Sequence, residues 1–162
     1  MKVSAKSEYG VRAMVLLARS YGQGPIPLNQ VAERERIPLP FLGQLMIPLL
    51  HDGMVTSVRG AHGGYQLARD PADISVGEVM RSIDGPIALS HCLEFGAGEQ
   101  GTCGMGVLIV DCTTRDVWAV LQEKISQMLD TFTLADLCHK PDVALRLPRP
   151  ENPAAVAIAL AR

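Results

Sequence analysis

The sequence predicts a mainly α-helical fold with one small β-hairpin. Three observations indicate it. Apolar residues recur at helical spacing in short segments before residue 53, a β-type alternation then surrounds a glycine-rich tip, and a longer amphipathic segment lies near residue 120. The chain has 162 residues, of which 48% are hydrophobic, so it has the size of one ordinary domain and enough apolar residues to fill a core.

The first helix is expected over Ser7–Tyr21, with Ser7 as its N-cap and Gly22 as its stop. Its apolar residues share one face at helical spacing, which predicts a buried side. These residues are Val11, Met14, Val15, Leu17 and Ala18.

A second and a third helix are expected in quick succession. The stretch "LNQVAERERI" predicts a short helix capped by Asn29, and "FLGQLMIPLL" predicts a helix opened by Pro38 and Pro40 and closed by Gly53. Pro48 falls inside the latter and is expected to kink or shorten it. Two short helices joined by a tight turn, after a longer one, are typical of a helix-turn-helix.

The next stretch, "MVTSVRGAHGGYQLA", predicts a hairpin, and three helices followed by a hairpin make a winged helix-turn-helix. In such a domain the third helix enters the DNA major groove, and the wing reaches a neighbouring backbone or minor groove. Arg59 is placed for a minor-groove contact, with a solvated hairpin arginine as an equally weighted alternative. The candidate DNA-binding residues are Lys2, Arg34, Arg36, Phe41, Gln44, Arg59 and His62.

Charge is unevenly distributed. Residues 1–70 hold eight Lys and Arg against five Asp and Glu, a net charge of +3, and residues 71–162 hold seven against twelve, a net charge of −5. This asymmetry suggests a division of labour between the two parts. The positive excess is small and by itself supports nucleic-acid binding only weakly, because phosphate contacts need clustered positive charge.

Three of the four cysteines, Cys92, Cys103 and Cys112, lie on a glycine-rich stretch with the spacing C-x10-C-x8-C. Compact zinc sites use C-x2–4-C pairs, which this chain lacks. Wide spacing on a loop whose glycines allow close backbone approach suits a larger group, such as an iron–sulfur cluster held by thiolates. The alternatives are three small buried core cysteines, or a zinc site that includes His91. Cys138 is outside the loop and is expected to be a packing thiol.

At this point the chain resembles the IscR/NsrR/RirA family of iron–sulfur transcriptional regulators. The wing "SVRGAHGGYQLA", the following "ISVGEVMRSIDGPI", the three-cysteine loop and "TLADL" after a long helix carry the resemblance, which covers about residues 1–140. It implies a homodimer with a winged helix in each protomer. It also implies a 2Fe–2S or 4Fe–4S cluster whose state controls binding to a double-stranded DNA operator.

The resemblance also bears on the fourth cluster ligand. Members of the IscR branch place a histidine three residues after the third cysteine, where this chain has Arg115, and a guanidinium does not coordinate iron. Some nitric-oxide-sensing relatives use an acidic residue at the start of the first helix, donated by the other protomer. Glu8 matches that position, so the expected metal ligands are Cys92, Cys103, Cys112 and Glu8. The alternative is that Glu8 only stabilises the first turn of its helix, where the helix dipole favours a negative charge.

The chain is therefore expected to divide into five regions. They are a DNA-binding winged helix-turn-helix (1–70), a linking helix region (71–90), the cluster loop (91–112), a dimerisation helix with a short following segment (113–140) and a Pro/Ala-rich tail (141–162). The long helix has an apolar stripe wide enough to bury against another helix. The stripe consists of Val117, Trp118, Leu121, Ile125, Met128 and Leu129.

Other classes of function remain as alternatives. A cluster-free thiol-redox repressor would use the loop cysteines as sensors, and a zinc-stabilised interaction protein would be colourless. An enzyme is least favoured, because the chain has no phosphate loop, no Ser/His/Asp arrangement and no recognisable carboxylate pair. No apolar run approaches the roughly 18–20 residues of a membrane helix, and no signal peptide precedes the first helix, so a cytoplasmic protein with reduced thiols is expected.

Overall fold

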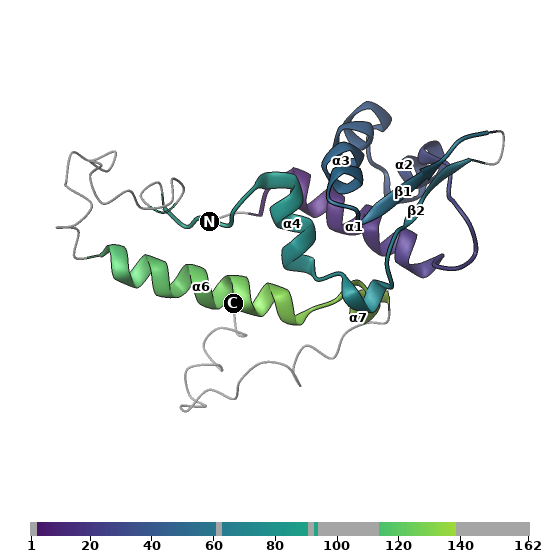
Figure 1. Cartoon of the computed structure of the whole chain (residues 1–162). Coiled ribbons are helices and arrows are strands. Elements are labelled where there is room, and N and C mark those ends of the chain that lie inside the picture. The colour runs from purple at the N-terminus through teal and green to yellow at the C-terminus, as the bar shows by residue number, and fades with distance from the viewer. Residues whose placement is uncertain (1–2, 61–62, 91–92, 94–113, 139–162) are drawn as a thin grey trace, which may run out of the picture.

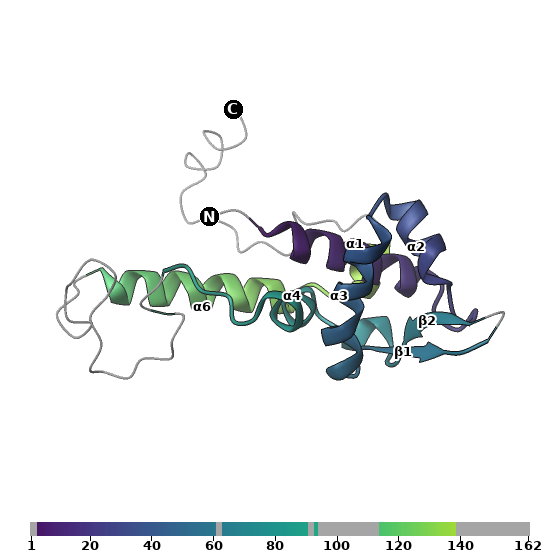
Figure 2. The same cartoon turned by 90° about the horizontal axis from the view of Figure 1, so that it is seen from above.

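The computed structural model describes residues 3–60, 63–90, 93 and 114–138. Its elements, in chain order, are α1 (Ala5–Arg19), α2 (Leu28–Glu35), α3 (Leu39–His51), β1 (Val55–Val58), β2 (Gly64–Leu67), the 3-10 helix η1 (Pro71–Asp73), α4 (Val76–Asp84), α6 (Arg115–Thr131) and α7 (Leu134–Cys138). The head comprises the elements from α1 to α4 together with α7. The N-terminal half of α6 extends away from this head, at the end opposite to the hairpin (Figures 1 and 2). The predicted fold class is confirmed.

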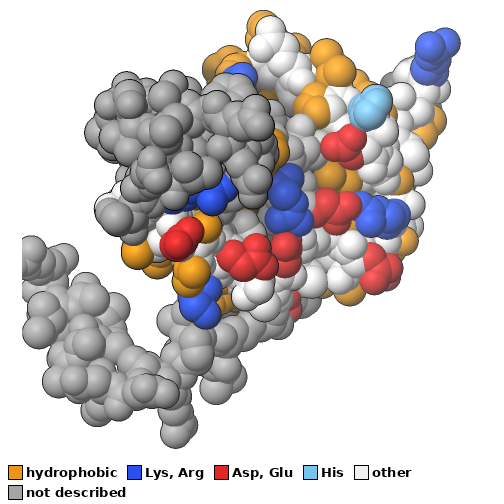
Figure 3. Space-filling view, turned by 60° about the vertical axis from the view of Figure 1, so that its left-hand side comes forward, with side chains coloured by type: hydrophobic (Ala, Val, Ile, Leu, Met, Phe, Trp, Pro, Cys, Tyr) orange, Lys and Arg blue, Asp and Glu red, His pale blue; other side chains and the backbone are white. Residues whose placement is uncertain are grey.

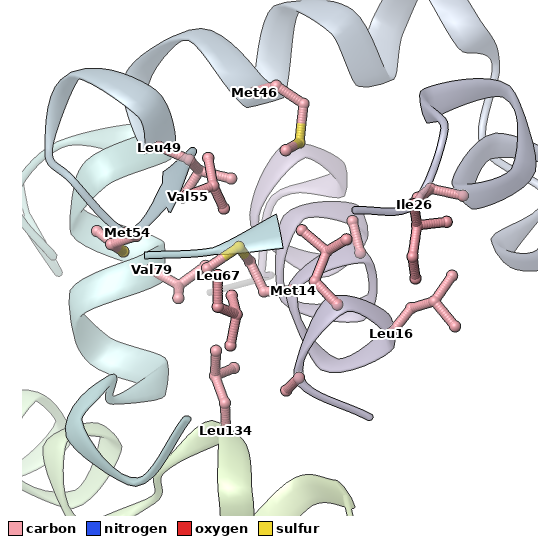
Figure 4. Close-up of a cluster of buried hydrophobic side chains, with 14 of the residues drawn as sticks. Met14, Leu16, Ile26, Met46, Leu49, Met54, Val55, Leu67, Val79 and Leu134 are labelled. Atoms are coloured by element: carbon pink, nitrogen blue, oxygen red, sulfur yellow. The ribbon is translucent and has the colours of Figure 1, made fainter. Parts of the chain in front are cut away.

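A single hydrophobic core holds the head together. Met14 of α1, Leu49 of α3, Val55 of β1, Val79 of α4 and Leu134 of α7 are all buried in it (Figure 4). Full burial of an aliphatic or methionine side chain contributes about 1.5–3 kcal/mol. The core therefore joins α7, which follows the long helix, to elements at the start of the chain.

The starts of α1 and α2 differ from the prediction. Ser4, rather than Ser7, is the N-cap of α1, and its Oγ accepts a hydrogen bond from the Ser7 N–H at 3.0 Å. Ser7 is one turn inside the helix and buried. The expected cap of α2 was also wrong: Pro27 occupies the N-cap position, and Asn29 lies in the first turn, where its Oδ1 accepts from the Gln30 N–H. Pro27 is already extended and sets the chain direction without a side-chain cap.

Helix α3 begins as predicted, with Pro38 at the N-cap and Pro40 in the first turn. Pro48 was expected to kink or shorten this helix, and it does not shorten it, because the helix continues to His51. The Pro48 carbonyl accepts from the Asp52 N–H at 2.9 Å, so regular hydrogen bonding resumes on its C-terminal side. Proline removes one backbone donor, and the buried Leu45, Met46 and Leu49 around it hold the helix in place.

The hairpin pairs Val55 with Leu67 and Ser57 with Tyr65, as the alternation predicted. A third backbone segment adds to it, since Ile26 and Tyr65 exchange two backbone hydrogen bonds of 2.9 and 2.8 Å. A Cβ at Gly64 would lie 2.2 Å from the Ile26 carbonyl oxygen, so only glycine fits this approach. The base of the wing is thus fixed to the connection between α1 and α2.

Candidate nucleic-acid interface and its link to the cysteine loop

The turn of the helix-turn-helix is held from behind by α1. Arg12 donates from Nε to the Glu35 carboxylate at 3.1 Å and from Nη2 to the Glu35 carbonyl oxygen. Its guanidinium also lies 5.7 Å from the ring centroid of Tyr9. Arg36, which ends α2, has a left-handed backbone with φ 54°, a conformation that non-glycine residues seldom adopt. These contacts fix the angle at which α3 follows α2.

The structure places four of the predicted DNA-binding residues in solvent. Arg34 and Arg36 are exposed at the end of α2, Gln44 is exposed on α3, and Arg59 is exposed directly after β1. They therefore lie on the elements of a winged helix-turn-helix that meet DNA. Lys2 and His62 lie outside the described residues.

Phe41 is the exception among the described candidates. It is half-buried, and its ring meets that of Tyr9 edge to face, with the centroids 5.7 Å apart and the planes at 83°. Edge-to-face aromatic pairs stabilise packing by about 0.5–1.5 kcal/mol. This contact accounts for Phe41 as a residue that joins α3 to α1.

Among the described residues of the face drawn in Figure 3, positive charge does not gather into one large area. The segment Leu39–His51 contains no lysine or arginine. On the face drawn in Figure 3, basic and acidic side chains lie side by side across the middle and hydrophobic side chains gather along the upper edge. Attraction to phosphates therefore depends on a few separate cations outside α3. Helix α3 itself presents no lysine or arginine to the bases.

Side chains link the head to α6 through α4. Ser7 of α1 donates to the Asp84 carboxylate at 2.6 Å, and Ser4 donates to the same oxygen. Arg81 of α4 forms two hydrogen bonds, of 2.7 and 3.2 Å, with the carboxylate of Asp130 in α6. Sequence reasoning missed these contacts because the partners are far apart in the chain.

The same junction is loosely packed on one side. A hollow of about 530 Å³ lies between the start of α1, the segment after α4 and the C-terminal half of α6, with Val3, Met80, Ile125 and Leu129 among its lining residues. In contrast, Gly77 is in tight contact with α6, because a Cβ there would lie 2.2 Å from Asp130 Oδ1. Helix α6 is therefore fixed to the head at Asp130, with free space beside it.

The described residues on either side of the cysteine loop both meet the N-terminal part of α6. The Leu89 N–H donates to Gln122 Oε1 at 3.2 Å, and Thr114 is the N-cap of α6. Gln122 and Thr114 are roughly 12 Å apart along the helix, at 1.5 Å per residue. The described residues that flank the loop thus both lie along the N-terminal half of α6. Cys92, Cys103 and Cys112 themselves lie outside the described residues.

Two further candidate residues can be placed. Glu8 is exposed in the first turn of α1, and no ion pair within the described part of the chain involves it. Cys138 ends α7, packs partly against the core, and burial raises the pKa of its thiol. A thiol with a raised pKa is a poor metal ligand at neutral pH, because metals bind the thiolate.

These features are those of a DNA-binding transcriptional regulator: a helix-turn-helix with a wing, exposed arginines at the turn and wing, and a long helix outside the head. Residues 3–140 match the Rrf2 family, described as an iron-dependent transcriptional regulator. The chain belongs to the Rrf2 family.

Individual relatives agree with this assignment. The chain is 36% identical over 152 residues to the HTH-type transcriptional regulator IscR of Serratia proteamaculans, covering 94% of this chain and 88% of that protein. Among solved structures it is similar to T. potens IscR, with 37% identity, a TM-score of 0.66 and coverage of 93% and 94%. It is also similar to CymR, the global cysteine regulator of B. subtilis, with 32% identity, a TM-score of 0.69 and coverage of 88% and 99%. These relatives regulate transcription and are not enzymes. No helix in the described ranges has the length and apolar character to span a membrane.

The exposed wing arginine gives a first test of the interface. Arg59→Ala should weaken binding to a specific operator by roughly 1–3 kcal/mol, as expected for a side chain that enters a groove. Affinity should be measured by gel shift at fixed salt, with Arg69→Ala as the control, since Arg69 is paired with Glu78 inside the head. Unchanged affinity of the Arg59 variant would reject its assigned role.

Proposed function

We propose that this chain forms a homodimeric repressor whose operator affinity is controlled by an iron–sulfur cluster bound by Cys92, Cys103 and Cys112. The observation that carries the proposal is the attachment of the cysteine loop. Both of its described flanks meet α6, and α6 is tied through Asp130 to α4 of the head. A change in the loop therefore has a short physical route to the DNA-binding elements.

The second part of the proposal, a homodimer, is supported by the apolar side of α6. Ile125 and Leu129 line the hollow beside the head, whereas Val117, Trp118 and Leu121 are 56%, 42% and 41% exposed. Val117 and Leu121 are four residues apart on one side of the helix. Such a stripe on a helix that extends beyond its own head matches the surface that a second helix would bury.

The donor set fits a cluster. Three thiolates are the ligands that iron–sulfur clusters take. Arg115, three residues after Cys112, is half-buried, and its Nε is buried with no hydrogen-bond partner among the described residues. A buried N–H donor of a guanidinium, three residues from Cys112 in the sequence, suits an anionic group. When bound, the cluster would supply a redox-active centre that reacts with small molecules.

Glu8 of the partner protomer is proposed as the fourth ligand. Its carboxylate is exposed and unpaired within the described ranges, so it is available to another chain. An oxygen donor binds a soft cluster more weakly than a thiolate, which suits an exchangeable position. Because α1 also holds the helix-turn-helix through Arg12, release of Glu8 would free the head to move.

Glu8→Ala should retain part of the cluster, shift its visible spectrum and uncouple DNA affinity from cluster state. Loss of the charge from the first turn should cost only about 0.3–1 kcal/mol of helix stability. Glu33→Ala, which removes another exposed carboxylate from the head, is the matched control and should leave the spectrum unchanged. An unaltered spectrum and a normal response of the Glu8 variant would remove Glu8 from the site.

The deciding experiment for the proposed function is anaerobic purification followed by a visible spectrum and by iron and sulfide counts. Coloured protein containing both iron and sulfide supports the cluster and distinguishes 2Fe–2S from 4Fe–4S. Colourless protein containing zinc would indicate a structural zinc site instead. Operator binding that responds to oxidants after complete cluster loss would favour the thiol-redox repressor.

A further inference from the structure

The solvent side of α3 exposes two large aliphatic residues. Leu42, Leu45, Met46 and Leu49 point into the core, whereas Leu39 and Ile47 are 46% and 65% exposed. Leu39, Gly43 and Ile47 follow one another at four-residue intervals, so they lie on one side of the helix. A single exposed aliphatic residue is ordinary on a protein surface. Here two exposed aliphatic residues lie on the side of α3 away from the core, and the helix carries no lysine or arginine. This side of α3 is therefore unusual for a DNA-reading helix.

The side chains of α3 limit which bases it reads well. Guanine is read mainly by arginine or lysine, and cytosine by glutamate or aspartate, and Leu39–His51 contains none of these. Its exposed groups are instead the aliphatic side chains of Leu39 and Ile47, the ring of Pro40, the amide of Gln44 and the imidazole of His51. An amide pairs with the adenine edge, and an aliphatic group contacts the thymine C5-methyl group. Both chemistries select A·T pairs.

Gly43 adds space to this surface. A Cβ built at Gly43 would meet no atom within 4 Å, so the position between Leu39 and Ile47 is open. Without a side chain there, the helix backbone can approach the floor of the major groove more closely than elsewhere along α3. The two aliphatic side chains then reach base edges on either side of this opening.

We propose that Leu39 and Ile47 read thymine methyl groups in the major groove, and that Gln44 takes an adjacent adenine. The operator specificity of α3 is then for A·T pairs and rests in part on apolar contact rather than on charged side chains. This inference rests on the DNA-binding function of α3 and is independent of the cluster.

The test uses an operator selected with the purified protein from a pool of random duplexes. Each thymine is then replaced by deoxyuridine, which lacks only the methyl group, and affinities are compared by fluorescence anisotropy at constant salt. Replacement at the contacted positions should weaken binding about fourfold each, the change that corresponds to about 0.8 kcal/mol for one buried methylene-sized group. In Ile47→Ala the penalty should vanish at one position of each half-site, and in Leu39→Ala at another.

Arg59→Ala is the control: it should weaken binding to the thymine and deoxyuridine duplexes by the same factor. Equal binding of both duplexes at every position would overturn the proposal, as would a full thymine preference in both the Leu39 and the Ile47 variants. A pool that yields no preferred sequence would contradict specific DNA reading altogether, and the proposal with it. Cluster loss that changes neither the operator affinity nor the thymine preference would leave the proposal standing while the proposed cluster control failed.

Discussion

Leu121→Asp should convert the protein into a folded monomer that binds its operator roughly 10²–10⁴-fold more weakly. Leu121 is exposed, and α6 contains no residue buried within its own chain, so the substitution leaves the core of the head intact. A carboxylate placed in an apolar helix pair is left without a partner, which is costly. A dimer gains its affinity by holding two half-sites at once, and a monomer loses that gain.

Analytical ultracentrifugation and fluorescence anisotropy measure the two parts of this expectation separately. Gln127→Glu is the control, since it adds the same single negative charge to α6 on the side where Gln127 donates to Glu123. The control should remain dimeric. A Leu121→Asp protein that stays dimeric and binds its operator normally would show that this side of α6 is not the interface.

The elements of the head could be predicted because local patterns determine them. The apolar spacing of α1, the prolines that open α3 and the alternation across the wing act within a few residues of the chain. One error arose where two signals of the same kind compete. Ser4 and Ser7 are both good N-cap residues, and both hydroxyl groups donate to Asp84, so residue type alone does not indicate which of them begins the helix.

The candidate DNA-binding surface could be predicted only in part. Residue types indicated exposed cations at Arg34, Arg36 and Arg59, and solvent exposure of these three agrees with that expectation. The orientation of α3 about its own axis, relative to α1, decides which of its side chains are buried. It places Phe41 against Tyr9 and leaves Leu39 and Ile47 exposed. No short stretch of sequence determines that orientation. Part of the α4 junction has a local signal, the N-cap residue Ser75, whose Oγ accepts from the Glu78 N–H.

The cysteine loop illustrates the limit of sequence reasoning about a site. Spacing and glycine content indicate the kind of group that three thiolates bind, and they do not indicate which element the loop serves. The hydrogen bond from Leu89 to Gln122 supplies that information, because it attaches the segment just before the loop to the N-terminal half of α6. A site that is built on the helix proposed for dimerisation is in a position to alter how the two heads are held.

Single replacement of Cys92, Cys103 or Cys112 by alanine should reduce the iron and sulfide content of the anaerobically purified protein by at least tenfold. Each of the three thiolates is a direct ligand in the proposed site, and changes to mere supporting residues of metal sites already cost 10–100-fold in affinity or activity. The visible absorption should disappear together with the iron. Operator binding should then become the same with and without the conditions that destroy the wild-type cluster.

Cys138→Ala is the matched control within the same chain, because it also removes one thiol. That thiol packs partly against the core, and burial raises its pKa. This variant should keep its iron, sulfide and colour and lose only a modest amount of thermal stability. Full iron and sulfide in any loop variant would exclude that cysteine as a ligand. Bleaching of a folded Cys138→Ala protein would place the fourth ligand on α7 rather than at Glu8. The cluster would then be fixed directly to the core of the head, and cluster loss would act on DNA binding without passing through the partner.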